Sequence, residues 1–168
     1  EKYLKNSGHE YFINVLSDKN KEVKFFSKVH SGDSYFPEKT NFYENTIVPK
    51  TLQATTLNDI QKKIQIPPPD FLKIDTQGSE IDILKGGSKI LNNCKIILLE
   101  CPIISYNTGA PPLNDYIEYL DNINYLPLEI TEKHYLDKVL VQIDIVFLKK
   151  DIFKNIYKDK KILKLFNK

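Results

Sequence analysis

Two periods of apolar residues run through this sequence of 168 residues. Runs rich in β-branched and aromatic residues favour strands, and apolar residues three or four positions apart favour helices. Strands are expected at residues 11–16, 22–26, 52–55, 70–75, 94–99, 125–130 and 139–148. Helices are expected from Thr56 or Asn58 up to the prolines at 67–69, and over residues 80–91, 113–123 and 152–166. Residues 30–50 follow neither period and are predicted to form a long, functional loop.

The order of these elements predicts an α/β fold. Strands that alternate with helices at this spacing form βαβ units and a parallel sheet, with helices on both faces. The run at 94–99 is apolar apart from one Lys, which is typical of a strand buried on both faces. The connection between 125–130 and 139–148 has about eight residues, too few for a parallel crossover, so these last strands should pair antiparallel. The first two strands should form a hairpin or a strand with its edge partner.

Two neighbouring strands of the predicted sheet end in an acidic residue, Asp75 and Glu100. Ligands of open α/β sheets bind beyond the carboxyl ends of the strands, so both carboxylates should face one crevice. One could act as a general base toward a hydroxyl group, or help to bind a divalent metal that orients it. Either could also bind an ammonium group or a sugar hydroxyl. The alternative is that these acids only cap helices or solvate loops.

The turn after the strand at 70–75 is the second candidate for chemistry. Gly78 lets the chain turn directly above the sheet, which brings backbone N–H groups near the crevice. Gln77 lies on this turn and is a candidate contact to substrate. Glu80 begins the following helix, where the helix dipole favours an acid, so helix capping competes with substrate binding as its role. Gly86 and Gly87 should interrupt that helix.

Residues 71–86, FLKIDTQGSEIDILKG, resemble the central motif of FkbM-type methyltransferases, which use S-adenosylmethionine. Segments 14–18, 54–60 and 142–148 resemble flanking family segments in the same order, with Asn58 where the family usually has Asp. The likeness covers roughly residues 10–150, so we expect a methyltransferase domain at 1–150 and a basic C-terminal helix or tail at 151–168.

This resemblance implies a Rossmann-like class I methyltransferase sheet, mostly parallel with an antiparallel last strand. It also implies S-adenosylmethionine as the donor and a hydroxyl on a sugar, polysaccharide or polyketide-like molecule as the acceptor. By position in the motif, Leu16 and Ser17 would lie near the adenine, and Asp75 near the methionine end of the cofactor. Glu100 and the acceptor-side residues Gln77, Gly78 and Glu80 would lie toward the substrate, with Asp75 and Glu100 as the catalytic residues.

The family's first strand, its Gly-rich loop and the acid that holds the ribose have no counterpart in this sequence, so the N-terminal strands of the domain are expected to be missing. We therefore expect this stretch alone to bind the cofactor weakly or not at all. A non-catalytic binding or assembly module of the same fold is the main alternative. A nucleotide-sugar transferase with a paired-Asp metal motif ranks last, because Thr76 and Gln77 follow Asp75 in place of a second acid.

The charge of the chain is unevenly distributed. Every basic residue is Lys, and residues 1–148 carry a net charge of −4 while 149–168 carry +6, within a total of +2. The absence of Arg argues against sequence-specific nucleic-acid recognition. The basic tail could contact an anionic membrane surface, or could pack one apolar stripe on the domain with its Lys side chains in water.

Metal and disulfide chemistry find little support in the sequence. His9, His30 and His134 show no metal-ligand spacing, so no metal ligands are assigned. Cys94 and Cys101 flank one strand and should lie roughly 20 Å apart, too far for a disulfide. Neither a signal peptide nor a membrane-spanning run is recognisable, which favours a cytoplasmic enzyme.

Overall fold

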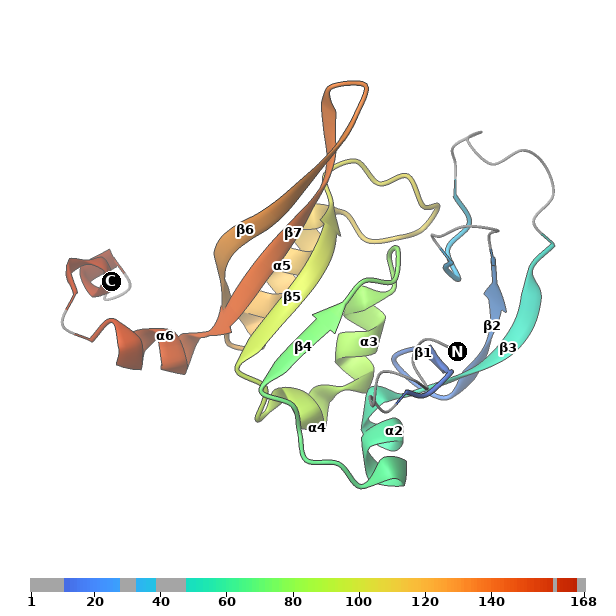
Figure 1. Ribbon diagram of the computed structural model, residues 1–168, viewed down its shortest axis with the longest axis horizontal. Helices are drawn as coiled ribbons and strands as arrows, with labels where there is room; N and C mark the ends of the chain where they lie inside the picture. Colours follow the sequence, from blue (N-terminus) through green and yellow to red (C-terminus); the bar gives the residue numbers. More distant parts are fainter. Residues whose placement is uncertain (1–10, 28–32, 39–47, 159, 166–168) are drawn as a thin grey trace.

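The computed structural model describes residues 11–27, 33–38, 48–158 and 160–165, which form two sheets and their helices (Figure 1). The smaller sheet has the strand order β1-β3-β2 and the larger sheet the order β4-β5-β7-β6. The strands are β1 (Val15–Leu16), β2 (Lys21–Phe25), β3 (Lys50–Thr55), β4 (Phe71–Ile74), β5 (Ile96–Pro102), β6 (Tyr125–Leu136) and β7 (Val139–Lys149). The helices are α2 (Leu57–Ile64), α3 (Glu80–Gly86), α4 (Ser88–Leu91), α5 (Leu113–Asn122), α6 (Lys150–Ile156) and the 3-10 helix η1 (Lys161–Leu165).

The smaller sheet is built around β3. This strand pairs parallel with β1 and antiparallel with β2, so the first two strands do not pair directly as expected. Strand β1 is also shorter than the predicted run over 11–16, since Phe12 and Ile13 are exposed. Much of the expected loop at 30–50 lies outside the described residues. Within its described part, Ser34 bridges to Phe26 and Glu38 bridges to Asn107.

Helix α2 begins where the sequence indicates. The side chain of Thr56 accepts a hydrogen bond of 3.0 Å from the backbone N–H of Asp59, so Thr56 rather than Asn58 is the N-cap. The helix ends at Gln65, which adopts a left-handed conformation (φ 56°) two residues before the first proline. The prolines follow the helix end and do not themselves terminate it.

The predicted interruption at Gly86 and Gly87 is confirmed, because it separates α3 from α4. Gly86 also allows a close contact between α3 and β1. A Cβ atom at this position would lie 2.2 Å from the backbone oxygen of Ser17 and 3.3 Å from the Cβ of Thr56. A side chain of any size at residue 86 would therefore push the helix away from the first strand.

The larger sheet ends in an antiparallel pair, as predicted. Strand β4 pairs parallel with β5, whereas β7 pairs antiparallel with both β5 and β6. Strands β4, β5 and β6 thus run in one direction, and β7 runs between β5 and β6 in the opposite one. Because β7 is inserted there and the N-terminal strands form a sheet of their own, two of the three pairs in this sheet are antiparallel. The expected mostly parallel, Rossmann-like sheet is not confirmed, and a mixed α/β fold is what the described strands form.

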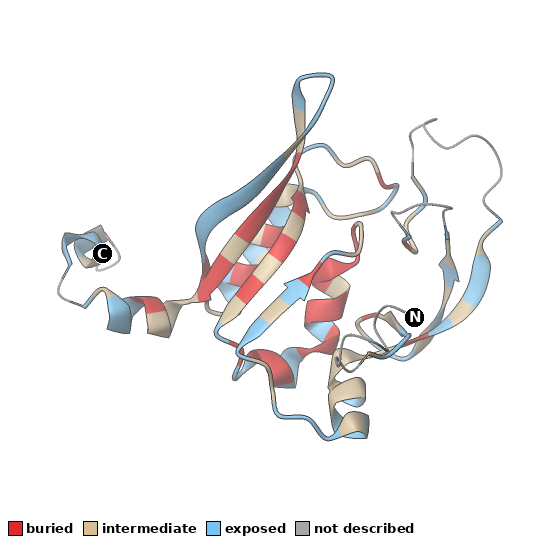
Figure 2. Cartoon of the chain, in the orientation of Figure 1, coloured by how far each residue is buried: buried red, intermediate tan, exposed pale blue. Residues whose placement is uncertain are grey.

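One face of the larger sheet carries the core (Figure 2). Alternate residues of β5, including Ile97, Leu99 and Cys101, are fully buried and pack with side chains of α3 and α5. The residues between them, such as Leu98, are only partly buried. The prediction that β5 is buried on both faces is therefore wrong. Helices α3 and α5 pack on this face, whereas Phe153 of α6 packs with Leu148 and the partly buried Ile96, which alternate with the core residues of β7 and β5, so the described helices contact both faces as predicted.

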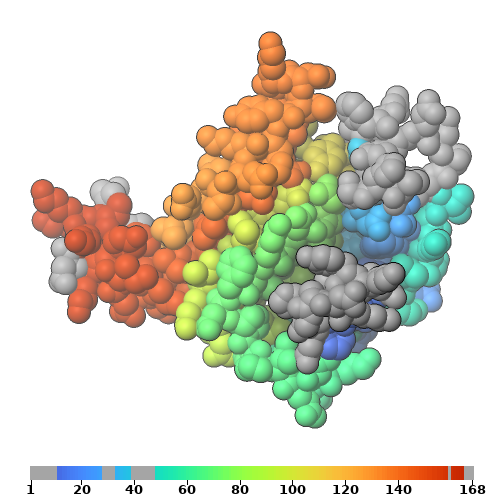
Figure 3. Space-filling view, in the orientation of Figure 1, coloured from blue at the N-terminus to red at the C-terminus, as the bar shows by residue number. Residues whose placement is uncertain are grey.

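Strands β6 and β7 form a longer hairpin than the sequence indicates. The expected eight-residue connection is instead the two-residue turn Asp137–Lys138, in which both residues have positive φ (47° and 68°). This is the requirement of a tight type I′ turn, but the pair lacks the Asn-Gly or Asp-Gly sequence that usually identifies one. The hairpin consequently extends β6 to Leu136 and projects from the body of the molecule (Figure 3).

The C-terminal segment is divided into α6 and η1, not the single helix expected over 152–166. Phe153 packs with Leu126 and Leu148 in a small second core, as the packing alternative for the tail expects. Contact with a membrane surface, and the division of the chain at residue 150, stay predictions. Among the described residues, no helix has the length and apolar character needed to cross a bilayer.

Cys94 and Cys101 are both buried and neither forms a disulfide bond. Burial raises the pKa of both thiols, since desolvation disfavours the thiolate.

Candidate functional site

Asp75 and Glu100 lie together at one edge of the larger sheet. Ile74 of β4 is the register partner of Leu99 of β5, so the two acids occupy the next, matching positions of these parallel strands. Their carboxyl groups are within hydrogen-bonding range of each other. Both side chains therefore lie at the same edge of the sheet as expected, but Glu100 and Asp75 line two different cavities, and their shared crevice and catalytic roles stay predictions.

The proximity of the two carboxyl groups moves their pKa values apart. Burial, followed by the hydrogen bond and the charge of Asp75, raises the pKa of Glu100 to about 8. The hydrogen bond from Glu100 lowers the pKa of Asp75 and outweighs its desolvation, with further help from Lys73, whose Nζ lies 3.1 Å from Asp75 Oδ2. Because two close carboxylates cannot both ionise cheaply, the raised pKa of Glu100 favours its protonated form and the lowered pKa of Asp75 favours its anion.

The turn that follows Asp75 is organised around Glu80. This side chain is only 1% exposed and begins α3. Its two oxygens accept hydrogen bonds from the backbone N–H of Thr76 (2.9 Å) and of Gly78 (3.0 and 3.2 Å) and from the hydroxyls of Thr76 (3.1 Å) and Tyr116 (2.6 Å). Substrate binding by Glu80 stays a prediction, but this geometry favours the alternative, in which Glu80 holds the turn and the helix start.

Gln77 connects the turn to the loop after β5. Its Nε2 donates to Glu100 Oε1 at 2.5 Å, and its Oε1 accepts from the hydroxyl of Tyr106 at 2.6 Å. The same hydroxyl lies 2.7 Å from Gln142 Oε1 on β7. These residues surround a cavity of about 20 Å³, large enough for one water molecule and not for a substrate. Gln77 thus orients Glu100, and its contact with substrate stays a prediction.

Gly78 is required by the path of the turn. Gln77 has a left-handed conformation (φ 56°), held because its backbone oxygen accepts hydrogen bonds from Ser34 Oγ (2.9 Å) and Asn107 Nδ2 (2.8 Å). Gly78 follows with φ 110°, and a Cβ atom there would lie 2.6 Å from the Cβ of Ala110. The turn is therefore fixed from both sides, although no direct role of Gly78 toward substrate is tested.

A second cavity brings Asp75 together with the first strand. It measures about 140 Å³ and lies between the two sheets, with both apolar and polar side chains in its lining. The lining residues are Val15, Leu16, Phe25, Asp33, Ser34, Tyr35, Asp75, Thr76, Ser79 and Ile83. The structure thus places Leu16 and Asp75 at one cavity, and their contact with a cofactor stays a prediction. Ser17 is fully buried beside it and donates to Asp18, so its expected contact is not seen in this lining.

Sequence reasoning missed two groups of polar residues near this edge. The hydroxyl of Tyr106 lies within hydrogen-bonding distance of both Gln77 and Gln142, but nothing in the local sequence around Tyr106 or Gln142 indicates this contact. Glu132, His134 and Asp144 gather on β6 and β7. The visible signal was Asp144, an acid inside the apolar run of β7, whereas His134 was dismissed because spacing along the chain does not reveal a partner on the next strand.

Comparison with known proteins gives one family. The methyltransferase FkbM domain matches residues 4–135. Searches of curated proteins and of solved structures return no significant match.

Proposed function

Because the chain belongs to the methyltransferase FkbM domain family, we propose that it transfers a methyl group from S-adenosylmethionine to a hydroxyl oxygen. The acceptor would be a hydroxyl on a sugar, a polysaccharide or a polyketide-like molecule. The observation that carries this proposal is the pair of Asp75 and Glu100 at the edge of the sheet, where Asp75 also lines the cavity next to Leu16.

The cavity between the two sheets suits part of such a cofactor. Val15, Leu16 and Ile83 offer apolar surface to an adenine ring or a methylene chain, and ionised Asp75 offers a counter-charge to a sulfonium or an ammonium group. Its volume of about 140 Å³ is smaller than the roughly 300–1,000 Å³ of typical ligand pockets, so these residues would hold only part of the molecule. When bound, S-adenosylmethionine supplies an activated methyl group whose C–S bond breaks as the new O–C bond forms.

Asp75 is the residue best suited to receive the acceptor's proton. Its side chain is 41% exposed and carries the negative charge of the pair, so a hydroxyl group from solvent can reach it. As the hydroxyl oxygen is methylated, its proton passes to an Asp75 oxygen. A weak base suffices, because that proton becomes acidic while the new O–C bond forms. The sulfonium donor supplies the driving force, and correct orientation supplies much of the rate.

Glu100 orients Asp75 and keeps the pair at a single negative charge below a pH of about 8. Gln77 in turn holds Glu100 through its amide, and Tyr106 holds Gln77. This chain of hydrogen bonds ties the reacting edge to the loop after β5, which limits the movement of the two carboxyl groups. Residues of that loop would then contact the acceptor.

The test compares Asp75→Asn with Asp70→Asn in the full-length protein. Asp70 is the matched control, because it is an acid that adjoins the same strand, β4, but lies at the opposite end of it. Its side chain is 78% exposed. With labelled S-adenosylmethionine and a panel of hydroxyl acceptors, Asp75→Asn should lower turnover about tenfold or more, within the range of general base catalysis. Asp70→Asn should leave turnover unchanged. Equal turnover of wild type and Asp75→Asn would remove Asp75 from this role.

A further inference from the structure

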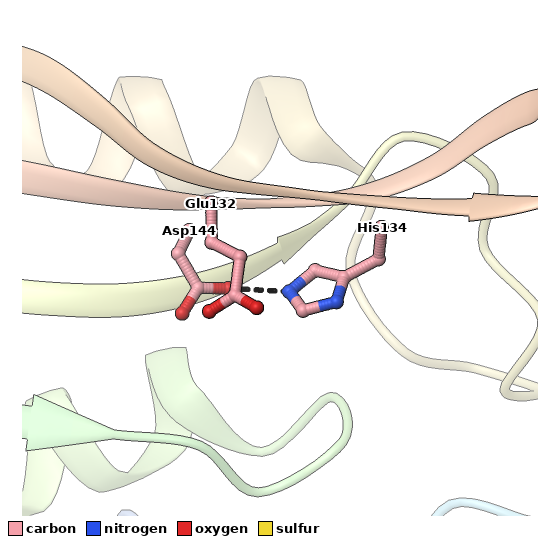
Figure 4. Close-up of side chains that lie close together, drawn as sticks. All are labelled: Glu132, His134 and Asp144. Carbon is pink, nitrogen blue, oxygen red and sulfur yellow. Dashed lines mark hydrogen bonds and ion pairs between the residues drawn. The ribbon is translucent and has the colours of Figure 1, made fainter.

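Three potential metal ligands converge on the β6–β7 hairpin. Glu132 and His134 lie on β6 and Asp144 lies on β7, and one ligand atom of each is within 4.8 Å of the others. Figure 4 shows the three side chains on the same side of the hairpin, with the imidazole ring directed at the two carboxylates. None of these residues takes part in the network around Gln77 and Glu80.

The strand register explains the convergence. Glu132 is the cross-strand partner of Asp144, and His134 is the partner of Gln142, so His134 is a diagonal neighbour of Asp144. Directly opposed side chains in an antiparallel pair have Cβ atoms about 4.5–5.5 Å apart, and diagonal ones remain within reach of long side chains. Register shifts between Ile130 and Glu132 and between His134 and Tyr135 flank the two β6 residues. Such irregularities often re-aim side chains beside functional sites.

The spacing of the ligand atoms fits one shared ion as well as a direct hydrogen bond. His134 Nε2 lies 3.2 Å from Asp144 Oδ1. Two ligands of one ion, each at a bond length of about 2.0–2.2 Å, lie roughly 3.0–3.5 Å apart in tetrahedral or octahedral geometry. Asp144 is only 5% exposed, while the side chain of His134 is 39% exposed, so the set is anchored in the fold and open to solvent on one side.

The charges around the hairpin favour a cation. Asp144 is the cross-strand partner of Glu100 on β5 as well as of Glu132 on β6, which aligns acidic residues across three strands. Lys73 is the nearby cation on the same edge, and its Nζ forms an ion pair with Asp75. A buried carboxylate such as that of Asp144 is stabilised when it is paired or bound to a metal.

We propose that Glu132, His134 and Asp144 bind one divalent transition-metal ion, with Zn²⁺ and Mn²⁺ as the ions that accept one imidazole and two carboxylates. Three protein ligands leave at least one position for water or for an oxygen of a bound molecule. Mg²⁺ and Ca²⁺, which prefer purely oxygen ligands, should bind more weakly. The proposal does not rest on methyl transfer, because metal binding is measured by itself.

The experiment titrates Mn²⁺ into chelator-treated full-length protein and counts the free ion by electron paramagnetic resonance. Wild type should bind one equivalent. His134→Ala and Glu132→Gln should each weaken binding about tenfold or more, since loss of even an outer-shell partner typically costs about 10–100-fold. Glu129→Gln is the matched control, because it removes one exposed charge from the same strand outside the cluster. It should change the affinity less than twofold.

Circular dichroism checks that each variant is folded. His134 is chosen for replacement because its side chain is partly exposed, whereas replacement of the buried Asp144 would disturb the core. Competition should show Zn²⁺ displacing Mn²⁺ while an equal concentration of Mg²⁺ does not. Failure of wild type to bind Mn²⁺ at millimolar concentration would overturn the proposal. So would an equal loss in Glu129→Gln and Glu132→Gln, which would indicate diffuse attraction to an acidic surface, or an unchanged affinity in folded His134→Ala.

Discussion

Two regions of this protein use acidic side chains in opposite ways. In the turn after β4, Glu80 is buried and its two oxygens accept hydrogen bonds from two backbone N–H groups and two hydroxyls. On the β6–β7 hairpin, Glu132, His134 and Asp144 point their ligand atoms at one another, and the hydrogen bond between His134 and Asp144 joins two of the three. Both regions lie beside the pair of Asp75 and Glu100. Asp75 directly precedes the turn in the sequence, and Glu100 is the cross-strand partner of Asp144 in the hairpin.

The difference separates structural acids from those with capacity for a ligand. A carboxylate whose lone pairs are all filled by donors of its own fold stabilises that fold and has little to offer a ligand. A carboxylate that faces other acceptors gains most from an added cation. The type of residue is the same in both regions, so the partner atoms decide the role.

The largest effect expected is the loss of stability when Glu80 is removed. Glu80→Ala would leave the N–H groups of Thr76 and Gly78 and the hydroxyl of Tyr116 without their acceptor. Each buried donor left unsatisfied costs about 1–3 kcal/mol, so the free energy of unfolding should fall by about 3 kcal/mol or more. Urea denaturation measures this change. The control is Glu118→Ala, which removes an exposed acid from α5. If this variant lost as much unfolding free energy as Glu80→Ala, the turn would have no special role in stability.

A smaller loss is expected from Gly78→Ala, which tests the path of the same turn. Alanine at this position would have to adopt a φ of 110°, and its Cβ would lie 2.6 Å from the Cβ of Ala110. Together the backbone strain and the clash should lower the free energy of unfolding by about 2–3 kcal/mol. Gly109→Ala is the matched variant, since Gly109 also has a positive φ (85°) but its nearest atoms are at 3.6 Å. It should cost about 1 kcal/mol, from conformation alone. Equal losses in thermal or urea denaturation would show that the contact with Ala110 is unimportant.

The smallest effect is expected on the hairpin. Glu132 is exposed, so Glu132→Gln in metal-free buffer should change the free energy of unfolding by no more than about 0.5 kcal/mol. Addition of Zn²⁺ should then raise the melting temperature of wild type more than that of the variant, because a ligand stabilises the form that binds it. A large loss of stability in metal-free Glu132→Gln would break the distinction between the two regions, since this acid would then be structural as well.

Local patterns predicted much of the fold because local chemistry determines those parts. Thr56 caps α2 through a hydrogen bond to a residue three positions away, and Gly86 and Gly87 separate two helices within one short segment. The placement of Asp75 and Glu100 also followed from the sequence, because the ends of adjacent parallel strands meet at one edge of a sheet.

The missed features depend on contacts between distant segments. Strand β7 enters between β5 and β6, and nothing within its own sequence encodes those neighbours. The tight turn at Asp137–Lys138 lacks the usual glycine, so the hairpin was predicted too short and His134 was assigned to a loop. The hydrogen bond from Tyr116 to Glu80 was not predicted, because the two residues lie 36 positions apart in the chain.

The most direct test of the account is the ionisation of Glu100, followed by carbon-13 nuclear magnetic resonance of its carboxyl group in metal-free buffer. If Asp75 and Glu100 share a proton, Glu100 in wild type should titrate at a pH of about 8, and Asp75→Asn should lower this pKa while burial keeps it above its usual value of 4.5. Asp70→Asn should leave it unchanged. Titration of wild-type Glu100 near 4.5, or a pKa that Asp75→Asn does not alter, would contradict the shared pair.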